Sequence, residues 1–127
     1  MIKVINTKDA PSAIGAYSQG IEARGFIFLS GQIPIKAESG EVLRGTVAEQ
    51  TEQVIQNISA LLAAEGVGFE NVVKTTCFLI NMADFDEFNA VYAKYFVNKP
   101  ARSTVAVAAL PRGVSVEIEV IAAAKGQ

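Results

Sequence analysis

Two segments with helical periodicity, each lying between segments of strand character, most constrain how this chain can fold. The first begins at Thr46, where Thr46-Val47-Ala48-Glu49 has the capping-box pattern, and its apolar residues recur at helical spacing until Gly66. The second begins at Asp84 and has an apolar stripe of aromatic residues: Phe85, Phe88, Tyr92, Tyr95 and Phe96. Because each helix connects two strands, right-handed crossovers place both helices on one face of a mixed sheet. The pattern therefore predicts an α+β fold.

The expected strands cover residues 1–5, 21–24, 26–30, 72–80, 103–110 and 114–123. Gly25 predicts a hairpin between the second and third of these, and Pro111-Arg112-Gly113 predicts the turn between the last two. The strands are apolar on both faces, whereas two helices cover only one face of a sheet. Since a bare apolar face of this size is an association surface, we expect a homo-oligomer whose sheets pack against one another.

The composition fits one soluble domain that spans residues 1–127. Half of the 127 residues are hydrophobic, which is enough for a core of its own. The net charge is −2 and the eleven Lys and Arg residues are spread along the chain, so nucleic acid is not an expected partner. The N-terminus does not resemble a signal peptide, and no stretch reaches the roughly 18 apolar residues that span a bilayer. We therefore expect a cytoplasmic protein.

The lack of histidine limits the chemistry. The sequence has no histidine and one cysteine, Cys77, which excludes His-based triads and argues against a structural zinc or a haem. Cys77 lies in the middle of a strand, and we interpret it as an inert, buried thiol. A general acid or base must then be a carboxylate, Tyr, Lys, Cys, a backbone group or water. We expect a site that needs no metal and no cofactor.

Glu117 and Glu119 are the most unusual charged residues, because they lie on one face of a strand whose other face is apolar. A carboxylate held in a covered sheet needs a partner. The expected hairpin brings these glutamates within reach of Arg102, which stands at the start of the neighbouring strand. A structural Arg–Glu pair and a functional one, in which Arg102 binds a ligand carboxylate with its planar fork, fit the pattern equally well. Taken alone, Arg102 is better explained as a surface charge at a strand end.

Three further candidates have weaker signals. Asn89 interrupts the aromatic stripe of the second helix and needs a partner, either in a structural hydrogen bond, which is favoured, or at a pocket wall. Gly31 follows Ser30 at the end of a strand and permits close approach of a ligand, although such a pair usually marks only a turn. Tyr17 is an aromatic residue in a glycine-rich loop, and the same alternatives apply to it.

Three motifs, in the same order, resemble those of the reactive-intermediate deaminase (Rid, or YjgF) family, and the resemblance covers essentially the whole chain. They are residues 10–20 (APSAIGAYSQG), residues 30–34 (SGQIP), and Pro100-Ala101-Arg102-Ser103 followed by Val116-Glu117-Ile118-Glu119. The resemblance implies a chorismate-mutase-like α+β subunit in a homotrimer, with sites in the clefts between subunits. It also implies hydrolysis of 2-imino acids, such as 2-iminobutanoate and 2-iminopropanoate, and of their enamine tautomers to 2-keto acids and ammonia.

The resemblance also implies roles for single residues. Arg102 would hold the substrate carboxylate, and Glu117, rather than Glu119, would orient or activate the attacking water. The cleft would be lined by Tyr17, Ser30, Gly31, Asn89 and Thr104. Many members have a cysteine at the position of Thr104, so no thiol-based role is expected there, and Ala16 replaces a common proline, which loosens that loop.

The alternative function is a non-catalytic regulatory or partner protein that binds a small carboxylate in the same clefts. Proteins of this kind have also been connected with chaperone-like and RNA-cleaving roles. The acidic balance and the lack of histidine argue against RNA cleavage.

Overall fold

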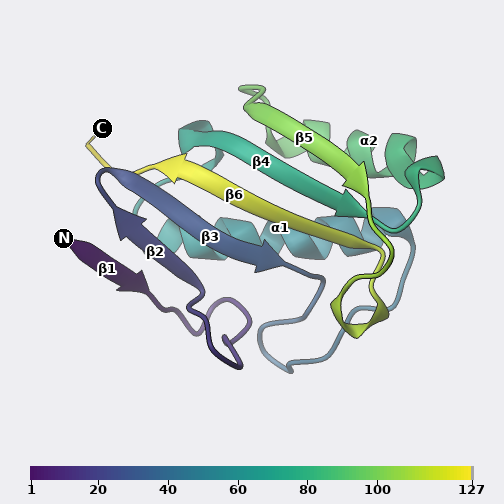
Figure 1. Cartoon of the computed structure of the whole chain (residues 1–127), viewed down its shortest axis with the longest axis horizontal. Helices are drawn as coiled ribbons and strands as arrows, with labels where there is room; N and C mark the ends of the chain where they lie inside the picture. The colour runs from purple at the N-terminus through teal and green to yellow at the C-terminus, as the bar shows by residue number, and fades with distance from the viewer. Residues whose placement is uncertain (127) are drawn as a thin grey trace.

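A six-stranded mixed sheet in the order β1-β2-β3-β6-β4-β5 is the framework of residues 1–126, the part of the chain that the computed structural model describes (Figure 1). The strands are β1 (Ile2–Ile5), β2 (Gly20–Ala23), β3 (Phe26–Gln32), β4 (Val72–Leu79), β5 (Ala101–Ala106) and β6 (Val116–Ala123). Neighbouring strands are antiparallel except β4 and β5, which are parallel. The sheet edges are therefore β1 and β5.

The helices α1 (Val47–Ala64) and α2 (Phe85–Tyr95) pack on the same face of this sheet, which confirms the predicted α+β arrangement (Figure 1). The capping box of α1 is present, because Glu49 N–H donates to Thr46 Oγ1 at 3.1 Å and Thr46 N–H donates to Glu49 Oε1 at 2.8 Å. Phe88, Tyr92 and Phe96 of the aromatic stripe are buried against the sheet. Single-turn helices precede β4 and α2 and follow β5, and they are η1 (Phe69–Asn71), η2 (Met82–Asp84) and η3 (Pro111–Gly113).

The first hairpin forms as predicted. Its two turn residues, Arg24 (φ 55°) and Gly25 (φ 82°), both adopt the left-handed backbone that a tight two-residue turn between antiparallel strands requires.

The predicted hairpin of the last two strands is wrong, because β4 lies between β5 and β6. The connection from β4 to β5 runs through α2, and a crossover of this kind makes the two strands parallel neighbours. β5 therefore adds to the outer side of β4, while β6 pairs with β3 on one side and β4 on the other. Residues 107–115, including η3, form a loop that returns the chain past β4, and not a strand turn.

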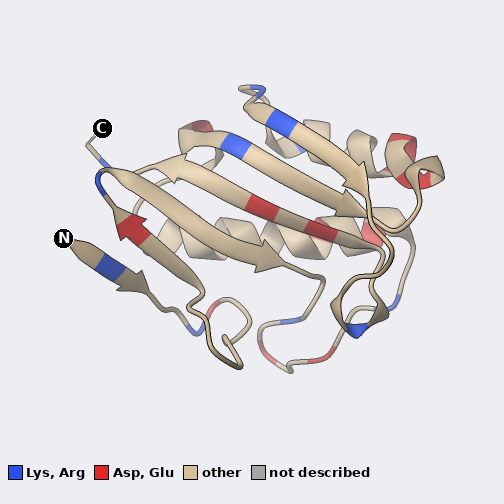
Figure 2. Cartoon of the chain, in the orientation of Figure 1, with Lys and Arg blue, Asp and Glu red and all other residues tan. Residues whose placement is uncertain are grey.

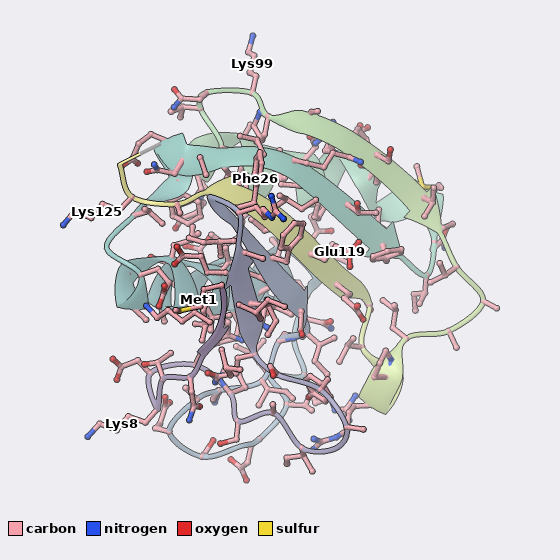
Figure 3. All side chains as sticks on the ribbon, turned by 60° about the vertical axis from the view of Figure 1, so that its left-hand side comes forward. Met1, Lys8, Phe26, Lys99, Glu119 and Lys125 are labelled. Carbon is pink, nitrogen blue, oxygen red and sulfur yellow. The ribbon has the colours of Figure 1, made fainter. Side chains whose placement is uncertain are left out.

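The second face of the sheet is open. Three apolar residues of its strands, Phe26 and Phe28 of β3 and Val105 of β5, are 43–44% exposed on this face. Figure 3 shows Phe26 and Glu119 on the strands of this uncovered side. The homo-oligomer that such a face suggests stays a prediction. Within residues 1–126, no helix combines the length and the hydropathy that a membrane span needs.

Candidate active site

Glu117 lies on β6 and points to the open face of the sheet. Its neighbours Val116 and Ile118 are fully buried on the helix side, so the alternation along the strand directs Glu117 and Glu119 to the opposite side. Across the sheet, Glu117 pairs with Phe78 of β4 and Glu119 pairs with Thr76. Figure 2 shows the two acidic positions as neighbouring bands along β6. The structure thus confirms that both glutamates share one face.

Gly31 provides the space in which the Glu117 carboxyl group lies. A Cβ atom at residue 31 would be 2.9 Å from Glu117 Cδ and 3.2 Å from Glu117 Cγ, and closer still to one carboxylate oxygen. The first distance is shorter than side chains in folded proteins tolerate. The β-bulge between Leu29 and Gln32 places Gly31 at an irregularity of the β3–β6 ladder. The glycine at this position therefore leaves room for the Glu117 carboxyl group.

Burial raises the pKa of Glu117, and the like charge of Glu119 raises it further. A carboxyl group of this kind holds its proton to higher pH than an exposed glutamate does. General acid–base catalysis works best when the pKa lies near the working pH. The shift is in the direction that suits a group exchanging protons near neutral pH.

A cavity of about 730 Å³ opens beside Glu117. Three of the residues predicted from the sequence, Tyr17, Ser30 and Gly31, line it together with Glu117. Ser30 Oγ donates to Ser18 O at 2.5 Å, which ties the strand end to the loop that carries Tyr17. The Tyr17 side chain is 55% exposed at the cavity wall, and its hydroxyl accepts a hydrogen bond of 3.4 Å from the Ile14 N–H. These four predicted residues form one group.

Gln19 is a structural residue of this site that the sequence analysis missed. Its side chain is 3% exposed, and its Oε1 accepts from Thr7 N–H at 2.7 Å. Its Nε2 donates to Pro11 O at 2.8 Å, to Thr7 O at 3.0 Å and to Ala10 O at 3.3 Å. One amide thus holds the chain ahead of Tyr17 against the start of β2. The available signal was a glutamine next to Gly20 at the start of an apolar strand.

Arg102 belongs to a second group, on the helix side of the sheet. It pairs in register with Thr75, which is buried beneath α2. Its Nη1 donates to Asn89 Oδ1 at 2.7 Å, and its Cζ lies 4.7 Å from the centre of the Tyr92 ring. The polar residue that interrupts the aromatic stripe of α2 therefore has a partner, as predicted. Arg102 and Asn89 line a cavity of about 620 Å³.

Thr104 lies two residues beyond Arg102 on the same side of β5. Its Oγ1 is buried and finds no hydrogen-bond partner among residues 1–126. Its register partner is Cys77, a buried thiol whose pKa is raised to about 11 by burial. Cys77 is thus a buried thiol, as expected, and the Thr104 hydroxyl lies on the same side of β5 as Arg102.

The two groups do not meet within one chain. Arg102 is level with Thr75 of β4 and Glu117 is level with Phe78 of the same strand. Side chains alternate between faces along a strand, so Thr75 and Phe78, three residues apart on β4, point to opposite faces. Their register partners Arg102 and Glu117 therefore also lie on opposite faces of the sheet. Figure 2 shows a basic band on β5 and the acidic bands on β6, with β4 between them. The expectation that a hairpin brings Arg102 within reach of Glu117 is therefore wrong.

Metal ligands are not clustered in the described part of the chain: residues 1–126 contain no group of three or more Cys, Asp or Glu side chains that could hold an ion.

These features define a small α+β protein with a carboxyl group in a cavity on the open face of its sheet and an ordered arginine on the helix-covered face. The sequence model of the family described as Endoribonuclease L-PSP matches residues 7–124. The chain belongs to this family, which is also known as the Rid or YjgF family.

Individual relatives agree over nearly the whole chain. The Putative regulator AldR of Lactococcus lactis subsp. lactis is 51% identical over 125 residues, which cover 98% of this chain and 99% of that protein. Reactive Intermediate Deaminase A, chloroplastic, of Arabidopsis thaliana is 47% identical over 121 residues, which cover 94% of this chain and 65% of that protein. The solved structure of YyfA from Yersinia pestis, a protein of the conserved Rid family, is also similar. Its TM-score is 0.94 at 48% identity, and the match covers 97% of this chain and 99% of that one.

Proposed function

We propose that this protein is a hydrolytic deaminase that converts reactive 2-imino acids and their enamine tautomers to 2-keto acids and ammonia. 2-Iminobutanoate and 2-iminopropanoate are the proposed substrates. The observation that carries the proposal is the half-buried Glu117 carboxyl group, with its raised pKa, held against Gly31 in a cavity. The name of the Arabidopsis relative supports the same reaction class.

The chemistry suits a site without histidine. Water adds to the carbon of the C=N bond, and Glu117 accepts a proton from this water. Glu117 passes this proton to the nitrogen, which gives a carbinolamine. The carbinolamine hydroxyl then gives up its proton, which reaches the nitrogen through Glu117, and the C–N bond breaks as the C=O bond forms and ammonia leaves. Positioning and proton transfer supply the rate acceleration, with acid–base help of about 10²–10⁴-fold. Arg102 binds the substrate carboxylate, since its planar guanidinium matches that group.

We further propose that the working site lies between subunits of a homotrimer. Arg102 and Glu117 lie on opposite faces of the sheet, so a ligand that touches both needs Arg102 of one copy and Glu117 of another. The exposed Phe26, Phe28 and Val105 make the open face suitable for burial against a second copy. In this arrangement Tyr17, Ser30 and Gly31 act with Glu117, while Asn89 and Thr104 act with Arg102.

The direct test couples the protein to a threonine dehydratase while semicarbazide traps free imine. We expect faster keto-acid formation with the protein present, and no acceleration would refute the enzyme. Glu117→Gln should abolish the acceleration, and Glu119→Gln, an isosteric change on the same face, should retain most of it. Arg102→Ala should abolish it, whereas Lys94→Ala, which removes an exposed cation of α2, should leave it unchanged.

A mixing experiment tests the shared site. Arg102→Ala and Glu117→Gln subunits, each inactive alone, are co-expressed and purified as mixed oligomers. If each site takes its two residues from different subunits, random mixing restores about a quarter of the sites. Mixed oligomers as inactive as either parent would contradict the proposal.

A regulatory protein that binds a small carboxylate without hydrolysing it is the second candidate, and the name of the Lactococcus relative favours it. Keto-acid binding without imine hydrolysis would identify this function. RNA cleavage is disfavoured by the net charge of −2 and by the scattered Lys and Arg residues (Figure 2). A cytoplasmic location stays a prediction, as the Arabidopsis relative is chloroplastic.

A further inference from the structure

The guanidinium group of Arg102 lies between two aromatic rings of α2. Its Cζ is 4.7 Å from the centre of the Tyr92 ring and 5.4 Å from the centre of the Phe85 ring. Both distances are within the range of about 6 Å for cation–π attraction. Phe85, Asn89 and Tyr92 follow one another at helical spacing, so a single face of α2 provides both rings and the Asn89 oxygen that accepts from Arg102.

Tyr92 is itself held in place. Its hydroxyl shares a hydrogen bond of 2.8 Å with Thr75 Oγ1, and Thr75 is the register partner of Arg102 on β4. Its ring stacks on Phe96 with a centroid distance of 4.3 Å and an interplanar angle of 23°, and it is 6% exposed. The ring is thus fixed to the same level of the sheet from which Arg102 projects.

Arg102 would otherwise be a mobile side chain, since it stands on an exposed edge strand. A long cationic side chain loses rotational freedom when it binds an anion, and that loss weakens binding. Contacts that order the side chain beforehand remove this cost.

We propose that Tyr92, assisted by Phe85, is a positioning residue that orders the Arg102 guanidinium for a ligand carboxylate through its ring. The inference rests on the proposed role of Arg102 and adds the residues that make this role effective. Tyr92 acts through Arg102 and does not itself touch the ligand. The Tyr92 hydroxyl is hydrogen-bonded to Thr75 Oγ1, so we assign the ordering of Arg102 to the ring.

The test measures binding of 2-oxobutanoate, the proposed product of 2-iminobutanoate hydrolysis, which retains the carboxylate, by calorimetric or NMR titration. Tyr92→Leu should weaken binding about fivefold to thirtyfold, the range that corresponds to loss of a cation–π contact. Tyr92→Phe keeps the ring, and Thr75→Val removes the same hydrogen bond from the other side, so both should bind within about twofold of the wild type. Phe85→Leu, at a half-buried position, should weaken binding in the same direction. In the imine assay, Tyr92→Leu should raise KM and leave kcat nearly unchanged.

A double-mutant cycle separates positioning from a general loss of structure. In an Arg102→Ala background, Tyr92→Leu should have no further effect on 2-oxobutanoate binding. The Arg102 side-chain N–H resonances should show ring-current shifts and slow rotation in the wild type and in Tyr92→Phe, and both should be lost in Tyr92→Leu. Equal weakening by Tyr92→Leu with and without Arg102, or unchanged Arg102 resonances in Tyr92→Leu, would overturn the proposal. If 2-oxobutanoate binds and these results hold but imine is not hydrolysed, the proposed enzyme fails while the role of Tyr92 stands.

Discussion

Gly31→Ala should disable the site through Glu117 while leaving the fold in place. The added methyl carbon would lie 2.9 Å from Glu117 Cδ and 3.2 Å from its Cγ, whereas ordinary contacts begin at about 3.4 Å. Because one carboxylate oxygen would be closer still, that oxygen must move by about 1 Å or the side chain must rotate to another conformation. Gly31 is not among the residues with positive φ, so alanine is compatible with the backbone. The effect of the change thus comes from the contact with Glu117.

The expected loss of activity is large compared with the loss of stability. A displacement of about 1 Å in a catalytic group reduces the rate by about 10²-fold. Overpacking by one methyl group costs about 1–3 kcal/mol, and the flexible end of a glutamate places the cost at the lower end of that range. We expect kcat/KM in the dehydratase-coupled assay to fall about 100-fold, with the melting temperature lowered by only a few degrees.

Glu117→Asp provides the matched control, because its shorter side chain leaves room for the methyl group. In that background Gly31→Ala should cost measurably less stability than in the wild type, which a double-mutant cycle of unfolding free energies detects. Wild-type kcat/KM in Gly31→Ala would refute the reasoning. So would the same stability cost in both backgrounds, since the methyl group would then be meeting something other than Glu117.

Three further outcomes are expected. Glu117→Gln should stabilise the protein at neutral pH. The raised pKa of Glu117 contributes stability below about pH 4.5, and this contribution is lost as the pH rises through the folded pKa. The gain from Glu117→Gln should therefore vanish in acid, and a pH-independent difference in denaturant melts would contradict this. Gln19→Ala should destabilise the protein by about 1–3 kcal/mol because Thr7 N–H and several carbonyl groups lose their buried partner. Lys8→Ala, at an exposed position of the same segment, is the control, and equal melting temperatures of the two variants would refute the role of Gln19. Thr104→Val should raise the unfolding free energy by about 1 kcal/mol, because it removes a buried hydroxyl that has no hydrogen-bond partner. The same change should weaken 2-oxobutanoate binding. A loss of stability would show that the hydroxyl already has a partner.

Local features of the sequence predicted the elements well. The Thr46 capping box, the Gly25 hairpin and the aromatic stripe of α2 depend on residues at most a few positions apart, and all three are present. The alternation around Glu117 likewise predicted that Glu117 and Glu119 share a face, because the period of a strand does not depend on its neighbours. Even the need of Asn89 for a partner followed from its place in an apolar stripe.

The order of the strands was beyond local reasoning. Two apolar segments joined by Pro111-Arg112-Gly113 have the pattern of a hairpin, and nothing near the turn indicates that another strand lies between them. The same alternation of side chains fits both arrangements. The choice depends on the α2 crossover, which commits β5 to the far side of β4 before β6 is reached along the chain.

By itself, then, the sequence determined which segments are helices and strands, that one sheet face lacks a cover, and which residue types are available for chemistry. Only the tertiary structure decided where those residues point. With β5 parallel to β4, Arg102 is level with Thr75 and turns toward α2, while Glu117 is level with Phe78 and turns toward the open face. The physical reason is the strict alternation of side chains across a strand, which converts the pairing order into opposite sides of the sheet.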